Sequence, residues 1–262
     1  MLKRTIVATI QPLVANHVYT VRHGLARGLR RRGGLGFLRP AGALSLEEAF
    51  LEQLDLQGQV VYDVGGYEGV MTLFFARRVG STGQVVTFEP NPRNHARIVE
   101  NVRLNGFQNV TVHRIALGHA PGQASLVFPI DEPARGSLRD DIQDEIWKEQ
   151  SAAVEVDAIQ VAVDSIDHQI ECGAPIPAFV KLDVEGVEYG VLEGMTHLLS
   201  QHHPRLYIEV HGAGAAKKLE NATAIIERLW QSDYRIDHVE SGTAIRTPPQ
   251  IASAIEGHLY CS

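Results

Sequence analysis

The chain has 262 residues and a formal net charge of −7, from 24 basic and 31 acidic side chains. Its hydrophobic content of 44% is enough for a full core, and its length favours one α/β domain with an appendage. The charge is unevenly distributed, because residues 1–46 hold eight Lys and Arg and no acid, whereas the other 216 residues hold 16 basic and 31 acidic groups. This balance excludes a uniformly basic nucleic-acid-binding protein, and we expect no nucleic-acid partner.

The two cysteines, Cys172 and Cys261, are too few for a disulfide framework and lack the C-x-x-C spacing of a zinc site. No run of about 18 apolar residues is present, so we expect no transmembrane segment. The N-terminus also lacks the continuous apolar core and cleavage site of a secretory signal. We therefore expect a cytoplasmic protein, and the sequence leaves its oligomeric state open.

Residues 1–45 are predicted to form a basic helical extension, with a helix over residues 13–32. Five apolar residues recur at helical spacing and share one face: Val14, Val18, Val21, Leu25 and Leu29. Two interpretations of this helix remain open. Either it packs on the main domain with a solvated basic face, or it makes peripheral contact with anionic lipid or with an anionic substrate.

From residue 59 onward, short apolar runs alternate with helical segments, which predicts a mostly parallel sheet with helices on both faces. Seven strands are expected, at residues 59–64, 85–89, 110–115, 179–183, 205–210, 234–239 and 258–261. The expected helices span residues 69–79, 92–105, 187–200 and 215–231. Asn91 followed by Pro92 is typical of an N-cap and a first helical residue. Together these segments predict a main domain over residues 46–262.

Residues 119–177 are less regular and are predicted to be an insert on the substrate side. We expect a hairpin at residues 123–128 and a strand at 154–163, on either side of an acidic stretch at 131–150. The acidic stretch is either a solvated loop or a substrate lid, and the sequence favours neither.

A glycine-rich loop follows the first expected strand of the main domain. The strand ends at Asp63, and Gly65, Gly66 and Gly69 form a tight turn into a helix, whose N-terminus offers free N–H groups to a ligand. The next strand ends in Glu89, where a carboxylate can accept hydrogen bonds from ribose hydroxyls. Glycine loop and carboxylate together predict a site for a nucleoside-bearing ligand, whereas the loop alone would be weak evidence.

The loop departs from the dinucleotide fingerprint G-x-G-x-x-G. The carboxylate of Asp63 would repel a pyrophosphate but would suit a cationic amino-acid tail. The pattern D-x-G-x-x-x-G, with an acid at the end of the second strand, is that of S-adenosylmethionine binding in class I methyltransferases. Ala116 and Leu117, after the third strand, are expected either to flank the adenine or simply to pack in the core.

At this point the chain resembles the FkbM-type methyltransferases, a class I family with a Rossmann-like fold. The matching blocks are YDVGGYEG (62–69), FEPNP (88–92), VENVRLNG (99–106), IALG (115–118), KLDVEGVEYGVLEGM (181–195) and PRLYIEVHG (204–212). The resemblance implies a seven-stranded sheet with an antiparallel last strand, for which residues 258–261 are the candidate. It also implies methyl transfer from S-adenosylmethionine, typically to a hydroxyl of a sugar, glycolipid or polyketide. Pro90 and Asn91, in the FEPNP block, join the expected cofactor site.

Candidate catalytic groups lie at the carboxyl ends of two strands, where ligands bind in such sheets. Asp183 ends one strand and Glu185 follows it, and Glu209 ends the next strand and His211 follows it. Residues two apart on a strand share a face, so we expect all four groups in the central cleft. Lys181, on the same face as Asp183, is expected to form a buried salt bridge.

An alcohol acceptor must lose its proton to a base or bind a metal. His211 is the best base by its ordinary pKa of about 6.5, and the alternative is a structural histidine bonded to a loop. Asp183 and Glu185 can act as the base, hold a substrate hydroxyl or, with Glu209, ligate Mg²⁺. We do not favour a metal, because scattered acids do not define a magnesium site. Glu188 is expected to interact with the N-terminus of its helix.

The leading hypothesis is an S-adenosylmethionine-dependent O-methyltransferase for a hydroxylated small molecule, glycan or glycolipid. One alternative is a nicotinamide-dependent oxidoreductase, which Asp63 and the missing fingerprint disfavour. The other is a non-catalytic cofactor-binding module that docks to a membrane or a protein through its basic N-terminal segment.

Overall fold

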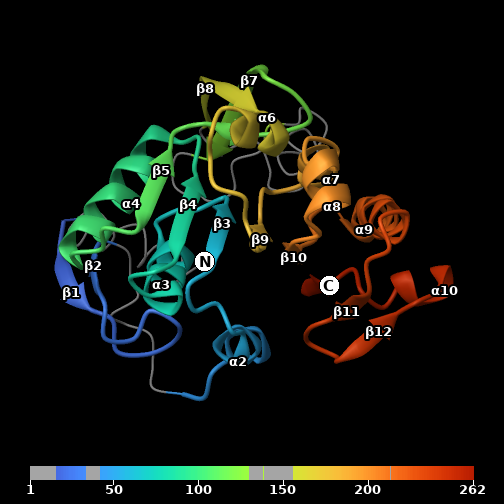
Figure 1. Ribbon diagram of the computed structural model, residues 1–262, viewed down its shortest axis with the longest axis horizontal. Helices are drawn as coiled ribbons and strands as arrows, with labels where there is room; N and C mark the ends of the chain where they lie inside the picture. The colour runs from blue at the N-terminus through green and yellow to red at the C-terminus, as the bar shows by residue number, and fades with distance from the viewer. Residues whose placement is uncertain (1–15, 34–41, 130–137, 139–155, 213) are drawn as a thin grey trace.

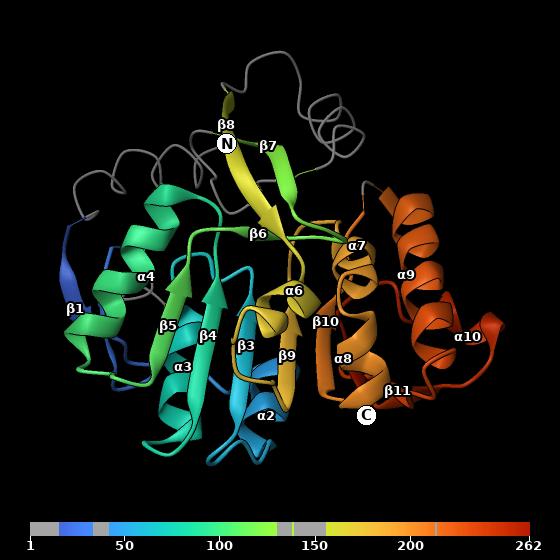
Figure 2. The same ribbon diagram turned by 45° about the horizontal axis from the view of Figure 1, so that its top comes forward.

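The computed structural model describes residues 16–33, 42–129, 138, 156–212 and 214–262. Its centre is a twisted sheet of eight strands, flanked by helices (Figures 1 and 2). In spatial order the strands are β12 (Thr243–Ile245), β11 (Ile236–His238), β13 (His258–Cys261), β10 (Arg205–Glu209), β9 (Phe179–Leu182), β3 (Val60–Val64), β4 (Gln84–Phe88) and β5 (Val110–His113).

Five neighbouring strands, from β10 to β5, are parallel, so their carboxyl ends meet at one edge of the sheet. Strand β13 is inserted antiparallel between β10 and β11. The expected Rossmann-like α/β fold with an inserted last strand is therefore confirmed. The seven expected strands are all present, and the short strand β12, which pairs with β11, is an eighth.

Helices cover both faces of the sheet, as the alternating pattern predicted. One face carries α2 (Leu46–Gln53), α3 (Val70–Val79) and, beside α3, α4 (Pro92–Leu104). The other face carries α6 (Ile166–Glu171), α7 (Glu188–Glu193), α8 (Thr196–Gln201) and α9 (Gly214–Trp230). The short helix α10 (Pro248–Ile251) lies next to α9. Asn91 caps α4 by accepting a hydrogen bond from the amide of Arg93, and Pro92 is the first helical residue, as expected.

The helix expected over residues 187–200 is instead two short helices, α7 and α8. Gly194 ends α7, and a side chain there would overlap the carbonyl of Gly118. The backbone of this segment therefore packs directly against the loop after β6 (Ala116–Leu117), which interrupts the helix.

Alternation along the buried strands divides the core into two layers. On β3, Tyr62 and Val64 pack toward α7, α8 and α9, whereas Val61 packs toward α2 and α3. Asp63 shares the second face and is fully buried, so its carboxylate lies under α3.

The N-terminal helix expected over residues 13–32 is wrong, because the described residues form an antiparallel hairpin of β1 (Val18–Thr20) and β2 (Arg30–Arg32). Gly24 and Gly28 adopt positive φ angles of 77° and 84° in the connection, where a helix would need right-handed geometry. The β-branched residues near Val18 also favour a strand. The apolar spacing of this segment is explained by burial rather than by a helix. Val21 and Leu25 are both buried in the hairpin and its connection.

A second sheet has the strand order β6, β8 (Val156–Asp164) and β7 (Gly122–Pro129), and its two long strands, β7 and β8, lie in the expected insert. The hairpin expected at residues 123–128 is instead one strand, β7, which pairs antiparallel with β8. Apart from Leu138, the acidic stretch 131–150 lies outside the described residues. Within the described part of the chain, no helix is long and apolar enough to cross a membrane.

Candidate active site

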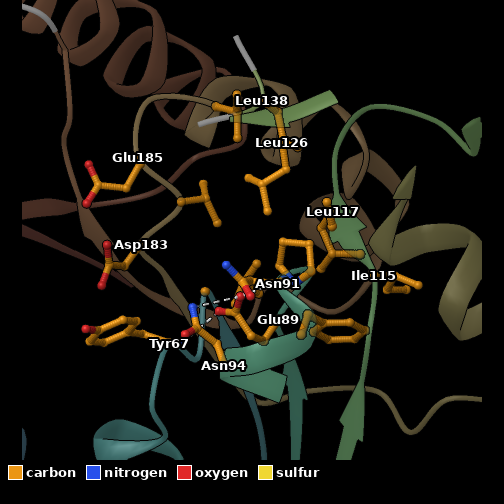
Figure 3. Close-up of a pocket in the computed structure, with 17 residues that line it drawn as sticks. Tyr67, Glu89, Asn91, Asn94, Ile115, Leu117, Leu126, Leu138, Asp183 and Glu185 are labelled. Atoms are coloured by element: carbon orange, nitrogen blue, oxygen red, sulfur yellow. Dashed lines mark hydrogen bonds between the residues drawn. The ribbon is translucent and has the colours of Figure 1, made fainter. Parts of the chain in front are cut away.

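A pocket opens at the carboxyl ends of β3, β4 and β9 (Figure 3). Glu89, Asn91 and Asn94 lie together at its base, and the carboxylates of Asp183 and Glu185 line one side. The opposite wall is apolar and consists of Ile115, Ala116 and Leu117 from the β5–β6 segment, Leu126 from β7, and Leu138. The pocket therefore has one apolar and one anionic wall.

The carboxylate of Glu89 is buried and held mainly by backbone amides. Its Oε2 accepts a hydrogen bond from the amide of Tyr67 at 2.8 Å, and its Oε1 accepts from the amide of Asn91 at 2.9 Å and from Asn94 Nδ2 at 3.3 Å. Burial raises the pKa of Glu89 to about 7, against the opposing effect of these donors. Oε2 retains an acceptor position, which suits a hydroxyl donor in the pocket.

The glycine-rich turn brings two strand ends into close contact. Gly65 has a φ of 81°, and a Cβ at this position would overlap the carbonyl oxygen of Asp183. A side chain at Gly66 would collide with Thr87 and Ile98, and Gly69 has a φ of 85° at the N-cap of α3. Gly65 lines the pocket, whereas Gly66 and Gly69 shape the turn behind it.

Asp63 does not line this pocket. Its Oδ2 accepts a hydrogen bond from the hydroxyl of Thr72 at 2.6 Å, and its Oδ1 lies 3.5 Å from Lys181 Nζ. Lys181 also donates to the carbonyl of Gly65 and lies 3.1 Å from Asp183 Oδ2. The buried salt bridge expected for Lys181 is present, and it links the glycine turn to the carboxylate of Asp183.

A cluster of acids surrounds His211 beside the pocket. Its Nε2 lies 3.8 Å from Asp183 Oδ1, 3.8 Å from Glu185 Oε2 and 3.6 Å from Glu209 Oε1. Its Nδ1 lies 2.8 Å from Oε1 of the fully buried Glu188. The structure thus brings together all four predicted catalytic residues, although Glu209 and His211 stand behind the two carboxylates that line the pocket.

The surrounding acids control the protonation of His211. Burial lowers its pKa, but the hydrogen bond and charge of Glu188, with the charges of Glu185 and Asp183, raise it to about 10. His211 is therefore an imidazolium at neutral pH. Burial raises the pKa of Asp183, but Lys181 and His211 more than compensate and lower it.

Glu185 differs from its neighbours in both backbone and protonation. It has a φ of 54°, and Tyr67, which also lines the pocket, has a φ of 47°. Non-glycine residues rarely adopt this left-handed region, and strained positions of this kind cluster at functional sites. Burial raises the pKa of Glu185 to about 7, with His211 opposing the shift.

A second histidine stands behind the acidic cluster. His258 Nε2 lies 3.6 Å from Glu209 Oε2 and 3.7 Å from Glu47 Oε1, and its Nδ1 lies 2.6 Å from Glu240 Oε1. Burial lowers the pKa of His258, but the hydrogen bonds to Glu209 and Glu240 raise it to about 9. Glu209 is therefore held between two imidazolium groups.

Asp183, Glu209 and His211 each place one potential ligand atom within 4.8 Å of the other two. Two carboxylates and an imidazole are suitable donors for a divalent cation. The same geometry also suits a proton on His211 Nε2, which faces both carboxylates.

Comparison with known proteins identifies the family. A family model described as "Methyltransferase FkbM domain" matches residues 63–236, about two thirds of the chain. The chain belongs to the FkbM methyltransferase family. No curated protein sequence matches it significantly.

A solved structure of an FkbM methyltransferase agrees with this family in fold. The chain is similar to an FkbM methyltransferase from Methylobacillus flagellatus KT, with a TM-score of 0.52 and 19% identity over 80% of this chain and 45% of that one. It therefore spans less than half the length of that structure. It also resembles an S-adenosylmethionine-dependent O-methyltransferase from Thermotoga maritima, with a TM-score of 0.45 and 13% identity over 86% of this chain and 66% of that one.

Two residues of this site differ from the expectation: Glu188 has a larger role than expected, and Asn94 was not expected at all. Glu188 was expected to interact only with its helix terminus. It does accept a hydrogen bond from the amide of Gly186, but it also bonds His211. Asn94, which supports Glu89, was missed. The signal was an amide side chain three residues after the N-cap of α4, because the first turn of that helix faces the end of β4.

Proposed function

We propose that this FkbM-family chain is an S-adenosylmethionine-dependent O-methyltransferase that acts on a hydroxyl of a sugar, glycolipid or polyketide-like molecule. The observation that carries the proposal is one pocket with two different carboxylate sites. Glu89 offers a buried acceptor beside an apolar wall, and Asp183 and Glu185 line the opposite side. The first site suits a nucleoside and the second suits a hydroxyl that must lose its proton.

The residues present fit the cofactor. We assign Glu89 to a ribose hydroxyl, and Ala116 and Leu117, with Pro90, to the adenine. Gly65 and Asn91 line the same pocket. When bound, S-adenosylmethionine supplies a methyl group that is already activated on a sulfonium. Three residues act from behind the pocket: Gly66 and Gly69 shape the turn, and Asp63 positions Lys181.

Glu185 is the best candidate for the base. It lines the pocket, and a pKa of about 7 leaves it partly ionised at neutral pH and able to take a proton from an acceptor hydroxyl. His211 is less suitable, because it already carries a proton. We assign His211 and Glu209 to positioning the two pocket carboxylates, and Asp183 to holding the acceptor hydroxyl.

The alternatives predict different outcomes. A nicotinamide-dependent oxidoreductase does not agree with membership of the FkbM family. A non-catalytic module would bind the cofactor without turnover. In that case the basic N-terminal segment would be the docking surface, but two of its basic side chains already pair with acids of the main domain. Arg31 forms an ion pair with Glu68, and Arg32 with Glu100.

The test is a panel of hydroxylated glycans, glycolipids and polyketides, with release of S-adenosylhomocysteine as the readout. We expect turnover with at least one acceptor and none with its analogue that lacks the reacting hydroxyl. Tight binding of S-adenosylhomocysteine without turnover on any acceptor would favour the non-catalytic module. Binding of NADH with no binding of S-adenosylmethionine would refute the proposal.

A further inference from the structure

The N-terminal hairpin lies outside the span that matches the FkbM model, yet it packs behind the cofactor turn. Strands β1 and β2 lie beside α4 (Figures 1 and 2). Tyr19, Val21 and Ala26 form an apolar cluster that packs against Val70, the first residue of α3. The hairpin therefore contacts the point where the glycine-rich turn becomes a helix.

A charged contact joins the hairpin to the turn itself. Arg31 is 7% exposed, and its guanidinium lies 2.9 Å from Oε2 of Glu68, inside the glycine-rich turn. The preceding residue, Tyr67, lines the pocket and donates its amide to Glu89. Consecutive residues of the turn thus face opposite ways, one to the nucleoside carboxylate and one to the hairpin.

A second contact runs through Asn101, which is fully buried. Its Oδ1 accepts a hydrogen bond from the amide of Arg32 at 2.8 Å, and its Nδ2 donates to the carbonyl of Glu68 at 3.0 Å. Glu68 is therefore held from the hairpin side through both its side chain and its carbonyl. Such support matters here because Tyr67 and Gly69 on either side have positive φ angles, and neighbouring contacts must stabilise that conformation.

We propose that Arg31 is a positioning residue for the cofactor: through Glu68 it holds the glycine-rich turn in the shape that places the Tyr67 amide on Glu89. This inference rests on the proposed function, because it concerns affinity for S-adenosylmethionine and its product. Arg31 touches neither the pocket nor the reacting atoms. Its effect is on the fraction of molecules whose turn is ready to bind.

The experiment uses the full chain and measures the Kd of S-adenosylhomocysteine by calorimetry. Arg31→Ala should raise that Kd about five- to tenfold, because a partly buried charge-assisted contact is lost. Arg31→Lys, which keeps the charge, should recover at least half of the lost affinity on a logarithmic scale. The matched control is Arg32→Ala, at the next residue of the same hairpin. It removes the ion pair between Arg32 and Glu100 but keeps the hydrogen bond from the Arg32 amide to Asn101. We expect the control to stay within twofold of wild type.

Hydrogen–deuterium exchange without ligand gives a readout independent of activity. Arg31→Ala should speed exchange at the amides of residues 66–69, and Arg32→Ala should not. A Kd for Arg31→Ala within twofold of wild type, or an equal loss in Arg32→Ala, would overturn the inference while the proposed function stands. A wild-type chain that binds no S-adenosylhomocysteine would overturn both.

Discussion

The two carboxylate sites of the pocket are stabilised in different ways. Glu89 is held by two backbone amides and the Asn94 amide, groups whose hydrogen-bonding role does not change with pH. Asp183 and Glu185 are surrounded by other titratable side chains, chiefly Lys181 and His211. The first site is thus built by the fold, and the second by a balance of charges.

This difference separates binding from chemistry. A carboxylate fixed by the backbone suits a part of a ligand that stays unchanged, such as a ribose. A carboxylate whose protonation depends on its neighbours suits proton transfer. Changes at the two sites should therefore affect different measurements.

The largest effect is expected at the charge-balanced site. Glu185→Gln removes the proposed base while keeping a similar shape, and should lower kcat by about 10²- to 10⁴-fold. The Kd of S-adenosylhomocysteine should change less than threefold. The matched control, Glu193→Gln, changes an exposed acid at the end of α7 and should leave both values unchanged. A loss of affinity with unchanged kcat would contradict the division between the two sites.

A smaller effect is expected at the backbone-held site, and it should change the Kd rather than kcat. Glu89→Gln removes the charge and replaces one acceptor oxygen with an amide group that cannot accept from Tyr67 or Asn91. The loss should be about 2 kcal/mol, or roughly 30-fold in the Kd of S-adenosylhomocysteine, with kcat at saturating cofactor nearly unchanged. A calorimetric titration measures the Kd. An unchanged Kd would show that Glu89 does not contact the ligand.

The two sites also differ in how far the sequence predicts them. Glu89 follows a buried apolar strand and precedes an N-cap followed by proline, so local patterns locate its carboxylate at a strand end. Two of its supporting amides, from Asn91 and Asn94, belong to the same local motif, and the third comes from Tyr67 in the glycine-rich turn. The position of Glu89 at the pocket is therefore largely predictable, whereas the position of Asp63 under α3 depends on the face of β3 that it occupies.

The acidic cluster is less predictable because its properties arise from contacts between separate strands and helices. The sequence placed Asp183, Glu185, Glu209 and His211 in one cleft, and the structure confirms their proximity. The pKa of His211 depends on Glu188, which is 23 residues away in the chain. The helix predicted over residues 13–32 is wrong for a related reason. The apolar spacing fits a helix, but two glycines in the connection have positive φ angles, which the observed hairpin allows and a right-handed helix does not.

The third prediction concerns stability at high pH. His211 has a pKa of about 10 in the folded chain and about 6.5 when unfolded, so its contribution is complete below pH 6.5 and is lost as pH rises through 10. The free energy of unfolding should therefore fall between pH 7 and 10, by at most about 1.4 kcal/mol per pH unit for this one proton. His258, with a pKa of about 9, adds a loss of the same sign.

The comparison that isolates His211 is Glu188→Gln, which removes the charge beside Nδ1. The fall in unfolding free energy between pH 7 and 10, measured by denaturant titration, should be shallower in this variant than in wild type. Glu193→Gln should follow wild type. Parallel curves for Glu188→Gln and wild type would show that Glu188 does not hold the proton on His211.

The smallest effect is expected from metal removal. Asp183, Glu209 and His211 have suitable donors, but a protonated Nε2 on His211 already supplies a positive charge between the two carboxylates. We therefore expect activity within twofold of the untreated enzyme after EDTA treatment and gel filtration, and no gain on adding Mg²⁺. If chelation abolishes activity and Mg²⁺ restores it, a cation replaces that proton. Asp183 and Glu209 would then be ligands fixed in geometry, and the contrast between a site built by the fold and a site balanced by charge would no longer hold.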